Sequence, residues 1–228
     1  PRPQKIRAAA TANHRMKVSG SSRKACQLKP VARLLASAMI LTTESCAFHI
    51  QPSTTSTTPV DKASLIPFPD YLNKLGVQSK QVVPDQLTDL KVTLPRPQGW
   101  TGYKNLNYSP GTVTIAKNDT YPLAMLMVFQ LSGDFDVKDA LKHSDADALL
   151  SENFKKLYSS TEDFQGYPSA MIEGSYDLHN RRMQSYNRIV IAQPSPPRPG
   201  IHYLIQLTVT TYAEQAKEQA GDIEAIIK

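Results

Sequence analysis

Apolar and polar residues alternate along most of the chain after Pro59, and this alternation predicts a sheet. The segments that carry the pattern are residues 90–94, 112–117, 122–131, 169–178, 182–192 and 202–211. A period of two residues is typical of β-strands, because successive side chains point to opposite faces of the sheet. Residues 169–178 and 182–192 are separated only by a short turn, in which Asn180 can adopt a positive φ. We therefore expect these two strands to form a hairpin.

Residues 122–131, "PLAMLMVFQL", are apolar on both alternating sets of positions. Ala124, Leu126 and Val128 make up one set, and Met125, Met127 and Phe129 make up the other. A strand that is apolar on both faces is typical of a sheet that is covered on both sides. The pattern thus predicts layers of helices above and below the sheet.

Three segments have the helical period and can supply these layers. They are residues 69–76, ended by Gly76, residues 133–154, and residues 212–228. Apolar stripes in the second and third consist of Val137, Ala140, Leu141, Ala148 and Leu149, and of Ala213, Ala216, Ala220, Ile223 and Ile227. The strands follow one another through short turns, and no strand–helix–strand rhythm appears. The expected fold class is therefore α+β, an antiparallel β-sheet sandwiched between helices.

The first 45 residues have a different character from the rest. A basic segment that ends at Arg33 precedes the uncharged residues 34–41, which are too few to cross a bilayer. This order is that of a secretory signal peptide, with Met16 as its expected start and residues 1–15 as an upstream extension. An amphipathic or core helix that begins the fold is the alternative. We expect residues 1–45 to be an upstream extension and signal peptide.

Cys46 follows this leader, and its surroundings predict a lipid anchor. Bacterial lipoproteins carry a diacylglycerol on a cysteine preceded by a lipobox, and Ser45 fits that box, whereas Thr43 and Glu44 depart from it. Residues 46–66 contain a Thr/Ser/Pro tract with few side chains to bury, which is typical of a disordered tether. The expected location is the outer side of the cell membrane, with the membrane as a partner through Cys46. Secretion as a soluble protein is the alternative.

Charge and cysteine content narrow the classes of function. Residues 1–50 contain nine Lys/Arg and one acid, Glu44, so the rest of the +6 chain has a net charge of −2. Nucleic-acid binding needs a basic folded domain, and only residues 179–188 form a small basic cluster, which a solvated hairpin face explains better. Both cysteines, Cys26 and Cys46, precede residue 50. A domain over 67–228 therefore has no internal disulfide, thiolate nucleophile or cysteine-bound zinc.

Three long segments resemble the mycobacterial LpqN/LpqT lipoprotein family. They are "YPLAMLMVFQLSGDFDVKDALKHSDADALLSENF", "SAMIEGSYDLHNRRMQSYNRIV" and "YLIQLTVTTYAEQAKEQAGDIEAII", and the likeness runs from about residue 69 to residue 227. The resemblance implies a PsbP/Mog1-like fold and a cell-envelope lipoprotein with no assigned enzymatic activity. The departure from the family pattern is at the lipobox.

The only tryptophan and two tyrosines lie beside glycines in residues 99–111. Trp100, Tyr103 and Tyr108 are candidate ligand-binding residues, because aromatic side chains on a loop can hold an acyl chain or a sugar. They can equally cap one end of the core.

No known catalytic motif occurs in the chain, and no cofactor is expected. Asp134, Asp136 and Asp139 have the spacing of helix-capping acids, and Asp145 and Asp147 that of a solvated helix face, so no metal site is expected.

The resulting hypothesis is a non-enzymatic envelope lipoprotein that binds a partner protein or an envelope lipid. The alternative is a lipid-acting hydrolase or transferase of the envelope, built on His143 or His179 with nearby acids.

Overall fold

The computed structural model describes residues 4–7, 61–118 and 120–228 of the 228-residue chain. The predictions of a signal peptide, of lipidation at Cys46 and of a tether over 46–60 lie outside these residues. Within the predicted tether, a short 3₁₀ helix, η1 (Lys62–Ser64), is capped by the Asp61 side chain.

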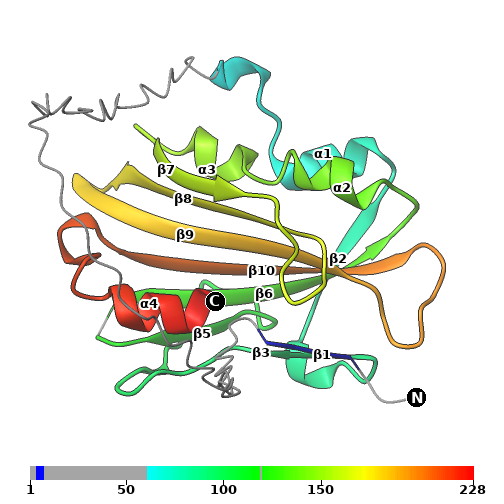
Figure 1. Cartoon of the computed structure of the whole chain (residues 1–228), viewed down its shortest axis with the longest axis horizontal. Helices are drawn as coiled ribbons and strands as arrows, with labels where there is room; N and C mark the ends of the chain where they lie inside the picture. The colour runs from blue at the N-terminus through cyan, green and yellow to red at the C-terminus, as the bar shows by residue number, and fades with distance from the viewer. Residues whose placement is uncertain (1–3, 8–60, 119) are drawn as a thin grey trace, which may run out of the picture. The chain divides into compact units, whose positions relative to one another are not determined.

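An antiparallel sheet is the centre of the described domain (Figure 1). Its strands lie in the order β4 (Thr101–Gly102), β5 (Val113–Ala116), β6 (Leu123–Ser132), β10 (Ile201–Tyr212), β9 (Arg181–Ala192), β8 (Ser169–Leu178) and β7 (Lys155–Ser160), and β2 (Gln78–Val82) also pairs with β6. A separate parallel pair joins β1 (Gln4–Arg7) to β3 (Leu90–Thr93). The predicted α+β class is confirmed.

Helices cover both faces of the sheet (Figure 1). On one side, the α4 face, Leu207 and Val209 of β10 pack in one core cluster with Ile226 of α4 (Ala220–Ile227). On the other side, the α1 face, Leu204 packs with Leu72 of α1 (Phe68–Lys74), and this cluster also contains residues of α2 (Val137–Leu141). Both layers bury apolar surface, which is the main favourable contribution to folding.

Strand β6 has the two apolar sets that the sequence predicts. Ala124, Leu126 and Val128 are buried on the α4 face. Leu131 is buried on the α1 face and Phe129 is packed against the same cluster. Met125 and Met127 are only half-buried, so the cover of the α1 face is incomplete along this strand.

The single helix expected over 133–154 is wrong, because the segment forms two short helices, α2 and α3 (Ala146–Leu150). Between them the Ser144 hydroxyl donates to the carbonyl of Leu141 at 2.7 Å. Serine side chains compete in this way with the helical backbone, and they favour helix ends over helix interiors.

The expected helix over 212–228 also differs. It consists of a 3₁₀ turn, η3 (Ala213–Gln215), followed after four residues by α4. Ile226 is buried although the predicted stripe omitted it, and Ala220 is exposed.

The expected hairpin of β8 and β9 is confirmed. Its turn places His179 and Asn180 at positive φ, 47° and 59°. Strands β2, β4 and β7 and the 3₁₀ helix η2 (Pro84–Gln86) were not predicted, because none of them has a regular apolar alternation.

Among the residues that the structure describes, no helix has both the length and the apolar character needed to cross a membrane.

Candidate functional site

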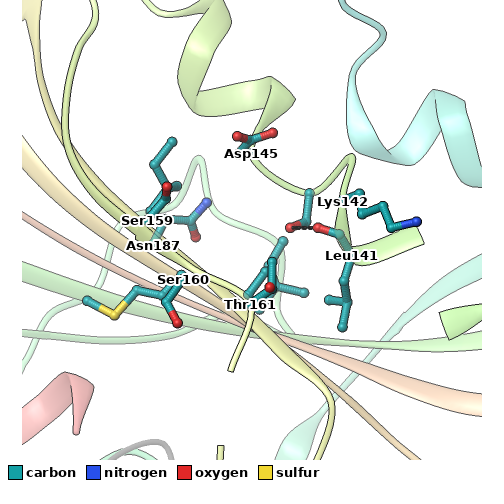
Figure 2. A pocket seen from close by; sticks show the side chains of 12 residues that line it. Leu141, Lys142, Asp145, Ser159, Ser160, Thr161 and Asn187 are labelled. Atoms are coloured by element: carbon teal, nitrogen blue, oxygen red, sulfur yellow. Dashed lines mark hydrogen bonds between the residues drawn. The ribbon is translucent and has the colours of Figure 1, made fainter. Parts of the chain in front are cut away.

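A hollow of about 220 Å³ lies between the α2–α3 connection and strands β7, β8 and β9 (Figure 2). We call it the α2–α3 pocket. Its apolar lining comes from Leu141 at the end of α2, from Ala170 and Ile172 of β8, and from Ile189 of β9. Three of these side chains belong to the core cluster of the α1 face, so the floor of the pocket is formed by buried core residues.

The polar lining of the α2–α3 pocket consists of uncharged groups, one carboxyl and one lysine. Hydroxyls come from Ser159 at the end of β7 and from Thr161 just after it. Ser160 also contacts the hollow, but it lies on the other face of the strand and its hydroxyl accepts a hydrogen bond from the backbone N–H of Glu162 at 3.1 Å. Asp145 lies across the hollow from them, at the start of α3 (Figure 2). Lys142 also lines the pocket, but its ammonium points away from Asp145 and pairs with Asp139 at 3.0 Å (Figure 2).

Asn187 is the polar residue of the floor. It is 9 % exposed and stands on the same face of β9 as Ile189. Its Oδ1 accepts a hydrogen bond from the Thr208 hydroxyl at 3.1 Å, which fixes the amide plane. No hydrogen bond among the described residues uses its Nδ2, so this group can donate to a molecule in the pocket.

Asp145 has an unusual electrostatic environment for a helix-start carboxyl. Partial burial raises the pKa of Asp145, and the charge of Lys156, a backbone hydrogen bond and the charge of His143 oppose this shift. Burial disfavours the ionised form because it removes water from the carboxyl. A hydrogen bond from a hydroxyl or an amide N–H of a bound molecule would offset part of this cost.

The arrangement can form hydrogen bonds with a molecule that carries several hydroxyl groups. Carboxylate, amide and hydroxyl groups accept and donate hydrogen bonds around one rim, and aliphatic side chains lie beneath them.

The structure places the sequence-predicted aromatic residues elsewhere. Trp100 is 3 % exposed and belongs to the core cluster of the α4 face. Its burial favours the interpretation as a cap of the core. Tyr103 and Tyr108 are half-exposed. Burial raises the pKa of the Tyr121 phenol, and the nearby Tyr103 and Tyr108 raise it further, so both lie close to Tyr121. None of the three lines the α2–α3 pocket.

The two histidines of the alternative hypothesis are exposed and lie in different parts of the fold. His143 follows α2 and stacks on the ring of Tyr71, with 4.0 Å between the ring centroids. His179 lies in the β8–β9 turn. Neither forms a hydrogen bond or an ion pair with a carboxylate of the described residues, so the catalytic arrangement expected for them is absent there.

Of the three acids predicted to cap a helix, Asp134, Asp136 and Asp139, the structure shows Asp136 in that role. The Asp136 side chain accepts a hydrogen bond from the backbone N–H of Asp139 at 2.9 Å, at the start of α2. Asp147 accepts a hydrogen bond from the backbone N–H of Phe68 at 3.3 Å. In the part of the chain that the structure describes, no group of three or more His, Cys, Asp or Glu side chains could hold a metal ion.

The α2–α3 pocket was not predicted from the sequence. The sequence offered only a weak indication, since Asn187 precedes the apolar Ile189 and Ile191 on the α1 face of β9 but follows the polar Ser185. The contribution of residues 159–161 to a pocket could not be predicted, because β7 itself was not predicted from the sequence.

Comparisons with known proteins agree on one family. The model of the family described as "Probable lipoprotein LpqN" matches residues 64–228. "Putative lipoprotein LpqT" of Mycobacterium tuberculosis (strain ATCC 25618 / H37Rv) is 50 % identical over 200 residues, which cover 86 % of this chain and 88 % of the relative. The LpqT protein of Mycobacterium leprae (strain TN) is 50 % identical over 163 residues, 72 % of this chain and 74 % of the relative.

A solved structure shows the same fold at lower identity. The crystal structure of LpqN, a protein involved in cell envelope biogenesis of Mycobacterium tuberculosis, aligns with a TM-score of 0.60 and 16 % identity over 72 % of this chain and 95 % of that one. The resemblance inferred from the sequence is thereby confirmed.

Proposed function

The chain belongs to the LpqN lipoprotein family, and from this premise we propose that it is an exported, membrane-anchored lipoprotein of the cell envelope that binds an envelope molecule without catalysis. The names of the mycobacterial relatives and the involvement of LpqN in cell envelope biogenesis support the location.

The proposed anchor is Cys46, on the outer side of the membrane. Two acyl chains on one cysteine would provide the double hydrophobic signal that stable membrane attachment requires. Replacing Cys46 by Ala should move the protein from the membrane fraction to the soluble fraction, and intact mass of the wild-type protein should show an acylated N-terminal cysteine. An unchanged membrane fraction in the variant would contradict the anchor.

The proposed ligand-binding site is the α2–α3 pocket, and the free Nδ2 of Asn187 is the observation that carries this proposal. A nearly buried amide whose oxygen is fixed by Thr208 offers donors in a defined direction. The carboxyl of Asp145 and the hydroxyl of Ser159 provide acceptors on the other sides of the hollow. These groups suit an uncharged, hydroxyl-rich head group.

Of the two ligand classes expected from the sequence, an envelope lipid fits this site better than a partner protein. The volume of about 220 Å³ suits a small head group, and the aliphatic floor offers apolar contact to the part of the molecule next to it. A protein interface of ordinary size would need a much larger complementary surface.

Native mass spectrometry of the protein purified from its own envelope tests the site. Wild-type protein should retain a lipid with a hydroxylated head group, and Asn187→Leu should lose it, because leucine has no hydrogen-bond donor. Ser159→Ala is the second variant, since Ser159 is exposed and its loss leaves the floor intact. Asn73→Leu, on the exposed side of α1, is the matched control.

Retention of the same lipid by both pocket variants would overturn the site. Absence of any lipid from correctly folded wild-type protein would overturn the proposed ligand class.

Tyr103 and Tyr108 remain a second proposed contact surface for an envelope lipid. They are half-exposed and lie near Tyr121. Replacing Tyr108 by Ala should reduce lipid retention if the tyrosines contact the ligand, and leave it unchanged if they only cover the core.

A further inference from the structure

Strand β7 is an edge strand of the sheet. One edge of β7 pairs with β8, and no strand of the described residues pairs with its other edge. Such an edge presents backbone N–H and C=O groups that another strand can bind.

The side chains of β7 are unusual for a free edge. Leu157 and Tyr158 are each 49 % exposed, and they are neighbours in sequence. They lie between two lysines, Lys155 and Lys156, and the hydroxyl residues Ser159 and Ser160. An apolar centre with polar ends is the pattern expected of a strand that is covered by a partner.

A β-bulge at the centre of β7 changes which of its residues share a face of the sheet. The register with β8 shifts between Lys156 and Tyr158, so that one extra residue lies in β7. Lys156 is opposite Gly174 and Ser159 is opposite Ile172, and residues two apart on β8 lie on the same face. Lys156 and Ser159 therefore share a face of the sheet although they are three residues apart.

The same relation holds on the opposite face. Lys155 is opposite Ser175 and Ser160 is opposite Met171, so Lys155 and Ser160 also share a face. In a strand without a bulge, residues separated by three or five positions would lie on opposite faces.

We propose that β7 pairs in antiparallel fashion with β7 of a second copy of this chain. The two-fold axis passes between Leu157 and Tyr158 and is perpendicular to the sheet. Rotation about this axis places the α1 faces of the two copies on the same side of the joined sheet. Residues that lie opposite each other across the axis must therefore be on the same face of their own sheets. The bulge satisfies this requirement for the pairs of Lys156 with Ser159 and of Lys155 with Ser160.

The positions of the charged residues favour this register, because it places no two lysines opposite each other. Lysines on an edge strand normally prevent pairing because they meet like charges or lose water. Here each lysine lies opposite a serine of the other copy, and Leu157 lies opposite Tyr158.

Disulfide trapping tests the register. In the full chain with Cys26→Ser and Cys46→Ser, the double variant Lys156→Cys with Ser159→Cys should form a covalent dimer under mild oxidation. Opposite Cβ atoms in an antiparallel pair are about 4.5–5.5 Å apart, close to the separation in disulfides. Each single variant is a matched control, because the bulge leaves its two cysteines two ladder positions apart along the strands, roughly 7 Å, which is too far for a disulfide.

Sedimentation velocity of the full chain with Cys46→Ser provides the second measurement. The sedimentation coefficient should rise with concentration, and Leu157→Lys, which adds a charge at the axis, should abolish the rise. A monomer at all concentrations together with no trapping would overturn the proposal. Equal trapping in the single and double variants would overturn the register. Neither outcome bears on lipid retention by the α2–α3 pocket.

Discussion

The indole Nε1 of Trp100 donates a hydrogen bond to Oδ2 of Asp222 across 3.1 Å. The same carboxylate oxygen accepts a hydrogen bond from Nζ of Lys117, just after β5, at 2.7 Å. Asp222 lies in the first turn of α4, so one side chain joins this helix to two segments at the edge of the sheet. Because Trp100 is buried, its N–H depends on this partner.

Replacing Asp222 by Ala should lower the free energy of unfolding by about 1–3 kcal/mol, since a buried donor loses its acceptor. Asp222→Asn should cost less, because its amide oxygen can still accept. Urea unfolding followed by fluorescence of the only tryptophan measures both. Asp85→Ala, at an exposed acid of η2, is the control, and equal values for the three variants would contradict the role of the contact.

The pKa of Asp222 is lowered, first by the hydrogen bond from Lys117 and then by that from Trp100. A carboxyl with a lowered pKa stabilises the fold above its unfolded value of about 3.9, and this contribution is lost as the pH falls through the folded pKa. We therefore expect the unfolding free energy of the wild type to fall more steeply below pH ~4 than that of Asp222→Asn. Parallel curves would show that the carboxylate contributes nothing.

Asp145 should behave in the opposite way, because burial raises its pKa. A raised pKa favours the fold below the unfolded value of about 3.9 and weakens it as the pH rises through the folded pKa. Asp145→Asn should thus increase the unfolding free energy at pH ~7, with a smaller gain near pH ~3. Thermal unfolding at the two pH values measures the difference, and a loss of stability at neutral pH would contradict it.

His202 is expected to make stability depend on pH near neutrality. Its Nδ1 is buried and has no hydrogen-bond partner among the described residues, and its ring contacts Phe135 edge-on with centroids 5.1 Å apart. Burial lowers the pKa of His202, which the charge of Asp134 opposes. A lowered histidine pKa makes the folded state bind its proton less readily than the unfolded state does. The unfolding free energy should therefore fall as the pH drops below about 6.5.

The variant His202→Leu should lose this dependence between pH ~7 and ~5. His179→Asn, in the exposed turn where asparagine tolerates the positive φ, should keep it. Chemical unfolding at a series of pH values separates the two, and an unchanged slope in His202→Leu would rule out this histidine as the cause.

Gly174 should not tolerate a side chain. A Cβ at this position would clash with the ring of Phe154 and would lie 2.9 Å from the carbonyl oxygen of Lys155. Gly174→Ala should lower the unfolding free energy by about 1–3 kcal/mol through overpacking. Combining it with Phe154→Ala should cost less than the sum of the two single changes, because the ring that causes the clash is gone. Strict additivity in the double variant would contradict the close approach.

The pattern of the sequence by itself determined the main strands and the two-sided cover of the sheet. Alternation along residues 202–211 predicted that Ile205, Leu207 and Val209 share one face, because every second residue of a strand faces the same way. The structure places this face against α4. The long likeness of residues 69–227 to one lipoprotein family also needed no coordinates. Such properties are local or periodic, so they can be read along the chain.

Only the tertiary structure decided where the polar side chains meet. Asn187 and Asp145 are far apart in sequence, and they line one pocket because the break between α2 and α3 places Asp145 above β9. The bulge in β7 and the burial of Trp100 likewise depend on pairing and packing with distant segments. The physical reason is that contacts between distant residues are set by the register of neighbouring strands and the filling of the core, which the pattern along one strand does not contain.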